Sequence, residues 1–168
     1  MHKLKAIDVA LIPIFAAILF AQEQLLSFLP NIQLTVFLII LYSKKLGLIR
    51  TSIIVIIHVI LDNLLMGSFN LLYVPFMLAG WLVIPITLNT IFKKCENPLI
   101  LAILSVAFAF IYCWLFIIPQ SLIANAHFKD YLKADLIFEG ILAISSFLST
   151  LWLYKPCKDV LNKVLTKD

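Results

Sequence analysis

The chain has 168 residues, of which 63% are hydrophobic and 13% are charged, and its mean hydropathy is +1.07. Ordinary soluble domains carry about 25% charged residues, so this composition excludes a typical soluble enzyme and predicts an all-α, polytopic integral membrane domain over residues 1–168. The formal net charge of +4 does not call for a nucleic-acid partner, because the placement of the basic residues explains it.

Six apolar segments follow one another along the chain and predict six transmembrane helices. Their ranges are 7–29, 32–42, 48–66, 71–92, 99–124 and 136–154. An even number of crossings puts both termini on one side, and a cytoplasmic N-terminus places 11 of the 13 basic residues in cytoplasmic segments, as the positive-inside rule favours. These 11 are Lys3, Lys5, Lys44, Lys45, Arg50, Lys93, Lys94, Lys155, Lys158, Lys163 and Lys167.

The first segment has two different sides. Ala6, Ala10, Ala17 and Ala21 fall within roughly 60° of one another on a helix, and such a small-residue face lets a second helix approach closely in lipid. Glu23 lies about 120° or more from that face, and a carboxylate at membrane depth usually faces a cavity or a partner. The alternative is that the alanines have no special role and that Glu23 lies near the membrane interface.

The second segment is unusually short. As a helix, residues 32–42 would span only about 17 Å, less than the roughly 30 Å of a hydrocarbon core. Pro30 favours a break before this segment. Two interpretations remain open: either the loop at 27–31 dips into the protein, as interrupted segments at transport sites do, or it is a plain tight turn.

The polar residues of the later segments fall mainly in the predicted outer halves. His58 and Asp62 share one face of the third segment, where they could simply bond each other, and Asp135 and Glu139 form a similar pair in the sixth. We expect few buried polar residues in the cytoplasmic halves, which favours an outward-facing pocket over a continuous pore. Glu23 and Glu139 are the strongest candidates for contacting a ligand with cationic or multiple donor groups.

Several kinds of chemistry lack their motifs. The chain contains no G-x-x-x-x-G-K-[ST], no H-E-x-x-H and no G-x-S-x-G. Cys95, Cys113 and Cys157 do not have metal-ligand spacing, so we predict no metal site, no cofactor and no enzymatic activity.

In order and spacing, four stretches resemble the substrate-binding S component of energy-coupling factor (ECF) vitamin transporters. They are the alanine-spaced first helix, SFLPNIQLTVFLIILYSKKLG at 27–47, NLLYVPFMLAGWLV at 70–83, and a tail that begins YKPCKDVLNKVL at Tyr154. The resemblance covers essentially the whole chain. It implies a six-helix, non-enzymatic protein of a prokaryotic plasma membrane that captures a water-soluble micronutrient from outside. Delivery would require a transmembrane T component and two cytoplasmic ATPase subunits.

The resemblance also implies roles for individual residues. The family's A-x-x-x-A motif packs on the T component and is best matched by Ala17 and Ala21, although Ala6 and Ala10 have the same spacing. The family's pocket is built from the first outer loop and the outer ends of later helices. The substrate-binding residues expected here are therefore Glu23, Asn31, Gln33, Asp62, Tyr73, Gln120, Asn125, His127 and Glu139.

Two other classes of protein remain open. A membrane-embedded hydrolase would use Glu23, Asp62, Glu139 and His58 as acid, base or metal ligands, provided that they converge. A membrane scaffold or assembly protein would use the alanine face for a partner and would have no pocket.

Overall fold

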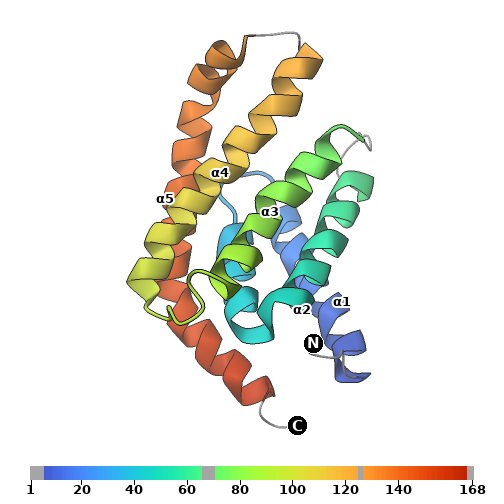
Figure 1. Cartoon of the computed structure of the whole chain (residues 1–168), viewed down its shortest axis with the longest axis vertical. Helices are drawn as coiled ribbons and strands as arrows, with labels where there is room; N and C mark the ends of the chain where they lie inside the picture. The colour runs from blue at the N-terminus through green and yellow to red at the C-terminus, as the bar shows by residue number, and fades with distance from the viewer. Residues whose placement is uncertain (1–5, 66–70, 125–126, 166–168) are drawn as a thin grey trace.

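A computed structural model describes residues 6–65, 71–124 and 127–165 (Figure 1). These residues form five helices and no strand, which confirms the all-α prediction. The helices are α1 (Ala6–Leu26), α2 (Thr35–Leu65), α3 (Tyr73–Asn89), α4 (Pro98–Ala124) and α5 (Phe128–Leu165).

Helix α2 contains two of the predicted segments, joined without a loop. At Gly47 the backbone leaves helical geometry, with φ 81° and ψ −179°, and divides α2 into arms at 35–46 and 48–65. This backbone region is essentially restricted to glycine. In Figure 1 the two arms meet near the lower end of the molecule and diverge upward from there.

Four helices, α1, α2, α4 and α5, are long and apolar enough to cross a membrane. The protein is therefore membrane-embedded and multi-pass. Helix α3 has 17 residues, and the arms of α2 are shorter than the whole helix, so six separate crossings and the cytoplasmic location of the termini stay predictions. In Figure 1, α1 begins and α5 ends at the same lower end, where α2 also breaks.

The first arm of α2 forms the centre of the protein. Every residue from Thr35 to Ser43 is buried, and α2 contacts each of the other four helices. Because protein surrounds this arm, its length does not have to match the thickness of the lipid core. This accounts for the unusually short second apolar segment.

Aromatic rings connect α3 to α4. Trp81 stacks on Tyr112 with ring centroids 3.8 Å apart, and Phe116 lies between Tyr112 and Tyr73 at centroid distances of 5.8 and 5.1 Å. A Cβ atom at Gly80 would lie only 2.7 Å from Tyr112 Cδ2. Gly80 therefore allows the close approach of the two helices.

Helix α5 is much longer than the predicted range 136–154, since it begins at Phe128 and ends at Leu165. Its polar ends extend the helix beyond the apolar segment, with Asp130 in the first turn and Lys163 in the last, where the helix dipole favours their charges. In Figure 1 the α4–α5 hairpin reaches further upward than the α2–α3 pair.

Candidate functional site

The loop between α1 and α2 lines a cavity of about 270 Å³. The lining residues are Glu23, Leu26, Ser27, Leu29, Pro30, Asn31, Ile32 and Gln33. Three of the predicted substrate-binding residues, Glu23, Asn31 and Gln33, are thus brought together at one cavity.

Side-chain hydrogen bonds fix the shape of this loop. Asn31 adopts the left-handed conformation, with φ 57°, which asparagine accepts more readily than most residues. Gln22 Nε2 donates to Thr35 Oγ1 at 2.8 Å, while its Oε1 accepts from the Leu34 amide at 2.8 Å. Thr35 Oγ1 in turn donates to Gln33 Oε1 at 2.8 Å. The end of α1 and the start of α2 are therefore tied together beside the cavity.

The loop is also attached to the middle of α5. The backbone N–H of Gln33 donates to Ser145 Oγ at 3.3 Å. Ser145 Oγ in turn lies 3.1 Å from the backbone carbonyl oxygen of Gln33, to which it can donate. Since Ser145 lies near the midpoint of α5, the loop lies partway along the helical array and not beyond its end, although Phe28 and Ile32 at its surface remain exposed. This favours the dipping loop over the plain turn. Ser145 carried no signal in the sequence, because a serine inside a long apolar segment is common.

Glu23 is paired with a buried imidazole. Its Oε2 lies 3.2 Å from His58 Nε2, and the two side chains are 25% and 1% exposed, respectively. Asp62, one turn beyond His58, is close enough to both residues to interact electrostatically. The sequence suggested that His58 could simply bond Asp62 on its own helix, whereas the structure pairs His58 with Glu23 of α1. The cavity-lining carboxylate is therefore coupled to α2.

A second set of hydrogen bonds joins the start of α3, the end of α4 and the start of α5. Tyr73 Oη donates to Gln120 Oε1 at 3.1 Å, and Tyr131 Oη donates to the same oxygen at 3.4 Å. Tyr73 and Gln120, which were both predicted to bind substrate, bond each other and do not line the loop cavity. Tyr131 was not predicted, because tyrosines near a helix end commonly serve as interface anchors.

The remaining predicted residues lie elsewhere. Glu139 is buried beside Asp135 and Cys113, and Asp62 is next to the Glu23–His58 pair but outside the cavity lining. His127 is exposed just before α5. Asn125 lies outside the described residues. The predicted residues thus lie in several separate places, and three of them line the loop cavity.

Buried polar residues are more widely spread than expected. Ser43, Thr51 and Thr150 are buried in the half of the molecule nearer Gly47, and Asp8 Oδ1 forms an ion pair with Arg50 Nε at 2.8 Å. The expectation that this half would hold few buried polar residues was wrong. Helix–helix contacts bury hydroxyl groups there that the sequence pattern does not distinguish from lipid-facing ones.

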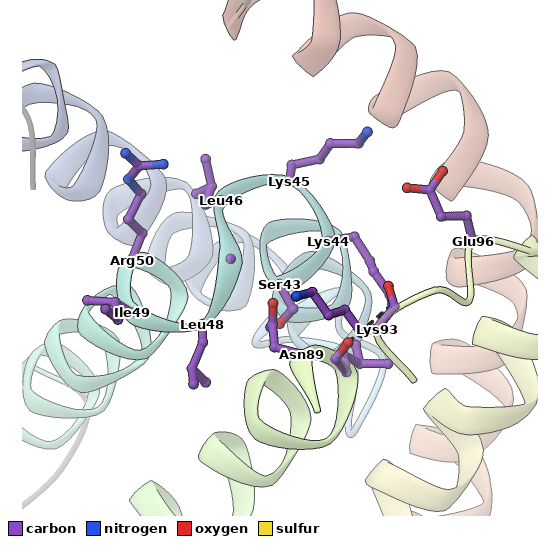
Figure 2. Close-up of a pocket in the computed structure, with 12 residues that line it drawn as sticks. Ser43, Lys44, Lys45, Leu46, Leu48, Ile49, Arg50, Asn89, Lys93 and Glu96 are labelled. Atoms are coloured by element: carbon purple, nitrogen blue, oxygen red, sulfur yellow. Dashed lines mark hydrogen bonds between the residues drawn. The ribbon is translucent and has the colours of Figure 1, made fainter. Parts of the chain in front are cut away.

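A larger cavity of about 510 Å³ lies beside the break at Gly47 (Figure 2). Its polar and charged lining residues are Ser43, Lys44, Lys45, Arg50, Asn89, Lys93 and Glu96. Figure 2 shows Lys45 and Glu96 extending toward each other from opposite sides. This basic cavity lies at the end that the positive-inside rule assigns to the cytoplasm.

Two of the four basic residues in this cavity already have partners. Lys44 Nζ donates to the carbonyl oxygens of Leu88 and Phe92 at 3.3 and 2.6 Å and so binds the end of α3, while Arg50 pairs with Asp8. We therefore interpret the basic residues mainly as links between helix ends. The loop cavity, with its carboxylate and amides, is the stronger candidate for binding a small molecule.

Comparison with protein-family models, with curated proteins and with solved structures finds no match to this chain. The ECF resemblance, the transport function and the partners therefore stay predictions. What the geometry adds is the loop cavity, the coupled Glu23–His58 pair and the buried group at Glu139.

Proposed function

We propose that this protein is the substrate-capture subunit of an ECF-type importer and binds a small, water-soluble micronutrient on the outer side of the membrane. The observation that carries the proposal is the loop cavity, because Glu23, Asn31 and Gln33 all line it. The ECF resemblance implied a pocket built from this loop, and hydrogen bonds between Gln33 and Ser145 attach the loop to the middle of α5.

The chemistry of the lining suggests the type of ligand. An ionised carboxylate can only accept hydrogen bonds, whereas the side-chain amides of Asn31 and Gln33 both donate and accept. The volume of about 270 Å³ is slightly below the range for small-molecule sites, roughly 300–1,000 Å³. A compact polar molecule that presents a cationic or N–H group to Glu23 fits this description best.

Energy for release would come from the partners. The chain has no P-loop motif, so a T component and two cytoplasmic ATPase subunits would have to supply the work. Among the described residues, α1 packs against α2 alone, and Ala17 and Ala21 are exposed on it. This free small-residue face suits a close helix–helix contact with the T component.

The first experiment is mass spectrometry of small molecules released from protein that is purified in detergent after growth in rich medium. We expect one polar compound at near-stoichiometric amount, and a loss of that compound in Glu23→Gln and Asn31→Ala variants. Glu96→Gln is the matched control for Glu23→Gln, because Glu96 lies outside the loop cavity and is not one of the predicted binding residues. An empty protein that stays empty when candidate vitamins are added back would contradict the proposal.

A hydrolase remains the second candidate, and the 3.2 Å contact between Glu23 and His58 is the observation that favours it. A carboxylate beside an imidazole can orient a general base. This alternative predicts turnover of a lipid or peptide substrate that His58→Ala abolishes. Turnover that survives His58→Ala would argue against it.

A further inference from the structure

Three potential metal ligands meet between α4 and α5. Cys113 belongs to α4, and Asp135 and Glu139 lie one turn apart on α5, so that both carboxylates fall on the same face. Each residue offers one ligand atom: Sγ of Cys113 and one carboxylate oxygen each of Asp135 and Glu139. These three atoms all lie within 4.8 Å of one another.

Glu139 is the unusual member of this cluster. It is 1% exposed, and neither of its carboxylate oxygens has a hydrogen bond of good geometry among the described residues. The Trp114 indole is the neighbouring N–H group. A buried carboxylate without a partner is costly, so such groups are normally neutralised, hydrogen-bonded or bound to a cation.

We propose that Cys113, Asp135 and Glu139 form a binding site for a divalent transition-metal ion of the zinc type. Zinc binds cysteine sulfur at about 2.3 Å and carboxylate oxygen at about 2.0–2.2 Å, mostly with tetrahedral geometry. Three protein ligands leave a fourth position for water. In a tetrahedral site with these bond lengths the ligand atoms are roughly 3.3–3.8 Å apart. The three atoms here all lie within 4.8 Å of one another, so each pair would have to approach by at most about 1.5 Å, which side-chain rotations can achieve.

The burial pattern fits such a site. Cys113 is 6% exposed, while Asp135 is half-buried, so the cluster is shielded without being sealed from its surroundings. A divalent ion would neutralise charge that is expensive at membrane depth. It would also connect α4 to α5 through their side chains. None of the three residues lines the loop cavity, so this site is independent of the proposed capture function.

The test uses Co²⁺ as a spectroscopic substitute for zinc. The full-length protein in detergent is stripped with a chelator, dialysed and titrated with Co²⁺. We expect one equivalent to bind with a thiolate-to-cobalt charge-transfer band in the near ultraviolet and with visible bands of tetrahedral intensity, and Zn²⁺ should remove both. A folded wild-type protein with no charge-transfer band would overturn the proposal.

Variants assign the ligands. Cys113→Ser should abolish the charge-transfer band, and Glu139→Gln should weaken Co²⁺ binding at least tenfold. Cys95→Ser and Cys157→Ser are the matched controls and should keep the band, because neither belongs to the cluster. A band that persists in Cys113→Ser would place the metal elsewhere and would also overturn the proposal.

A second measurement does not depend on how the Cys113 variant folds. In the Cys95→Ser, Cys157→Ser double variant, Cys113 is the only thiol, and its alkylation rate can be followed with and without Zn²⁺. We expect at least a tenfold slower reaction with Zn²⁺, and Glu139→Gln in the same background should remove most of this protection. An unchanged alkylation rate would contradict metal binding at Cys113.

Discussion

Glu23 Oε2 of α1 lies 3.2 Å from His58 Nε2 of α2, and the imidazole is almost completely buried. His58→Ala removes the partner of a carboxylate that is itself three-quarters buried. Leaving such a group unsatisfied costs about 1–3 kcal/mol, so we expect a lower unfolding temperature in detergent. The double variant Glu23→Gln, His58→Gln should lose less stability than the sum of the losses in the single variants Glu23→Gln and His58→Gln. The reason is that the double variant leaves no uncompensated charge. Strictly additive losses would show that the two side chains do not interact.

Gly80 should be intolerant of even one added methyl group. The Cβ atom of Gly80→Ala would lie 2.7 Å from Tyr112 Cδ2, so the ring stacked on Trp81 would have to shift. Overpacking of this kind costs about 1–3 kcal/mol. Gly140→Ala is the control, since a Cβ there meets nothing within 4 Å and alanine is the better helix former by about 1 kcal/mol. In thermal unfolding, Gly80→Ala should lower the unfolding temperature and Gly140→Ala should raise it. Equal unfolding temperatures would contradict the close contact at Gly80.

The ion pair between Glu96 and Lys158 gives a pH dependence that can be measured. The hydrogen bond from Lys158 holds the pKa of the Glu96 carboxyl below its ordinary value of 4.5. The pair therefore stabilises the fold fully above pH 4.5 and loses its effect as the pH falls through the lowered pKa. Because Glu96 is largely exposed, we expect only about 0.2–1 kcal/mol at neutral pH and low salt. The free energies of unfolding of the wild-type and Glu96→Gln proteins should differ by this amount at neutral pH and become equal in acid. A difference that does not change with pH would exclude the ion pair as its source.

The free face of α1 can be tested with bulky residues. Ala17→Trp combined with Ala21→Trp should abolish assembly with the T component and transport, because tryptophan prevents close helix approach. Ligand affinity should stay nearly intact, since both alanines are exposed and outside the loop cavity. Ala107→Trp is a matched control on the exposed side of α4 and should leave assembly unchanged. Loss of ligand binding in a folded double variant would refute the assignment of this face.

Much of the fold follows from hydropathy. The α4 range of 98–124 differs from the prediction by one residue at its start, because Asn97 and Pro98 provide a clear beginning: Asn97 Oδ1 accepts from the Leu99 amide at 2.9 Å. The predicted gap between the second and third segments was wrong, since Gly47 alone makes the turn and Lys44 and Lys45 are helical. Hydropathy marks charged residues as loop, but it does not detect a helix that continues through them.

The site was less predictable than the fold. Glu23, Asn31 and Gln33 lie close together in the sequence, and their meeting at one cavity follows from a short loop. Cys113 and Glu139 are on different helices, so only the packing of α4 on α5 brings them together. Periodicity shows which residues share a face of one helix, but it does not show which faces of two helices meet.

The one-residue turn at Gly47 bears on how this protein enters the membrane. The arm at 35–46 is only about 18 Å long and is too short to be held in a bilayer alone. We expect it to become stable only after the arm at 48–65 has also been synthesised. The cations Lys44, Lys45 and Arg50 surround the turn and resist translocation. We therefore expect the two arms to insert together as a hairpin whose tip never leaves the cytoplasmic side, which makes Gly47 a determinant of biogenesis as well as of shape.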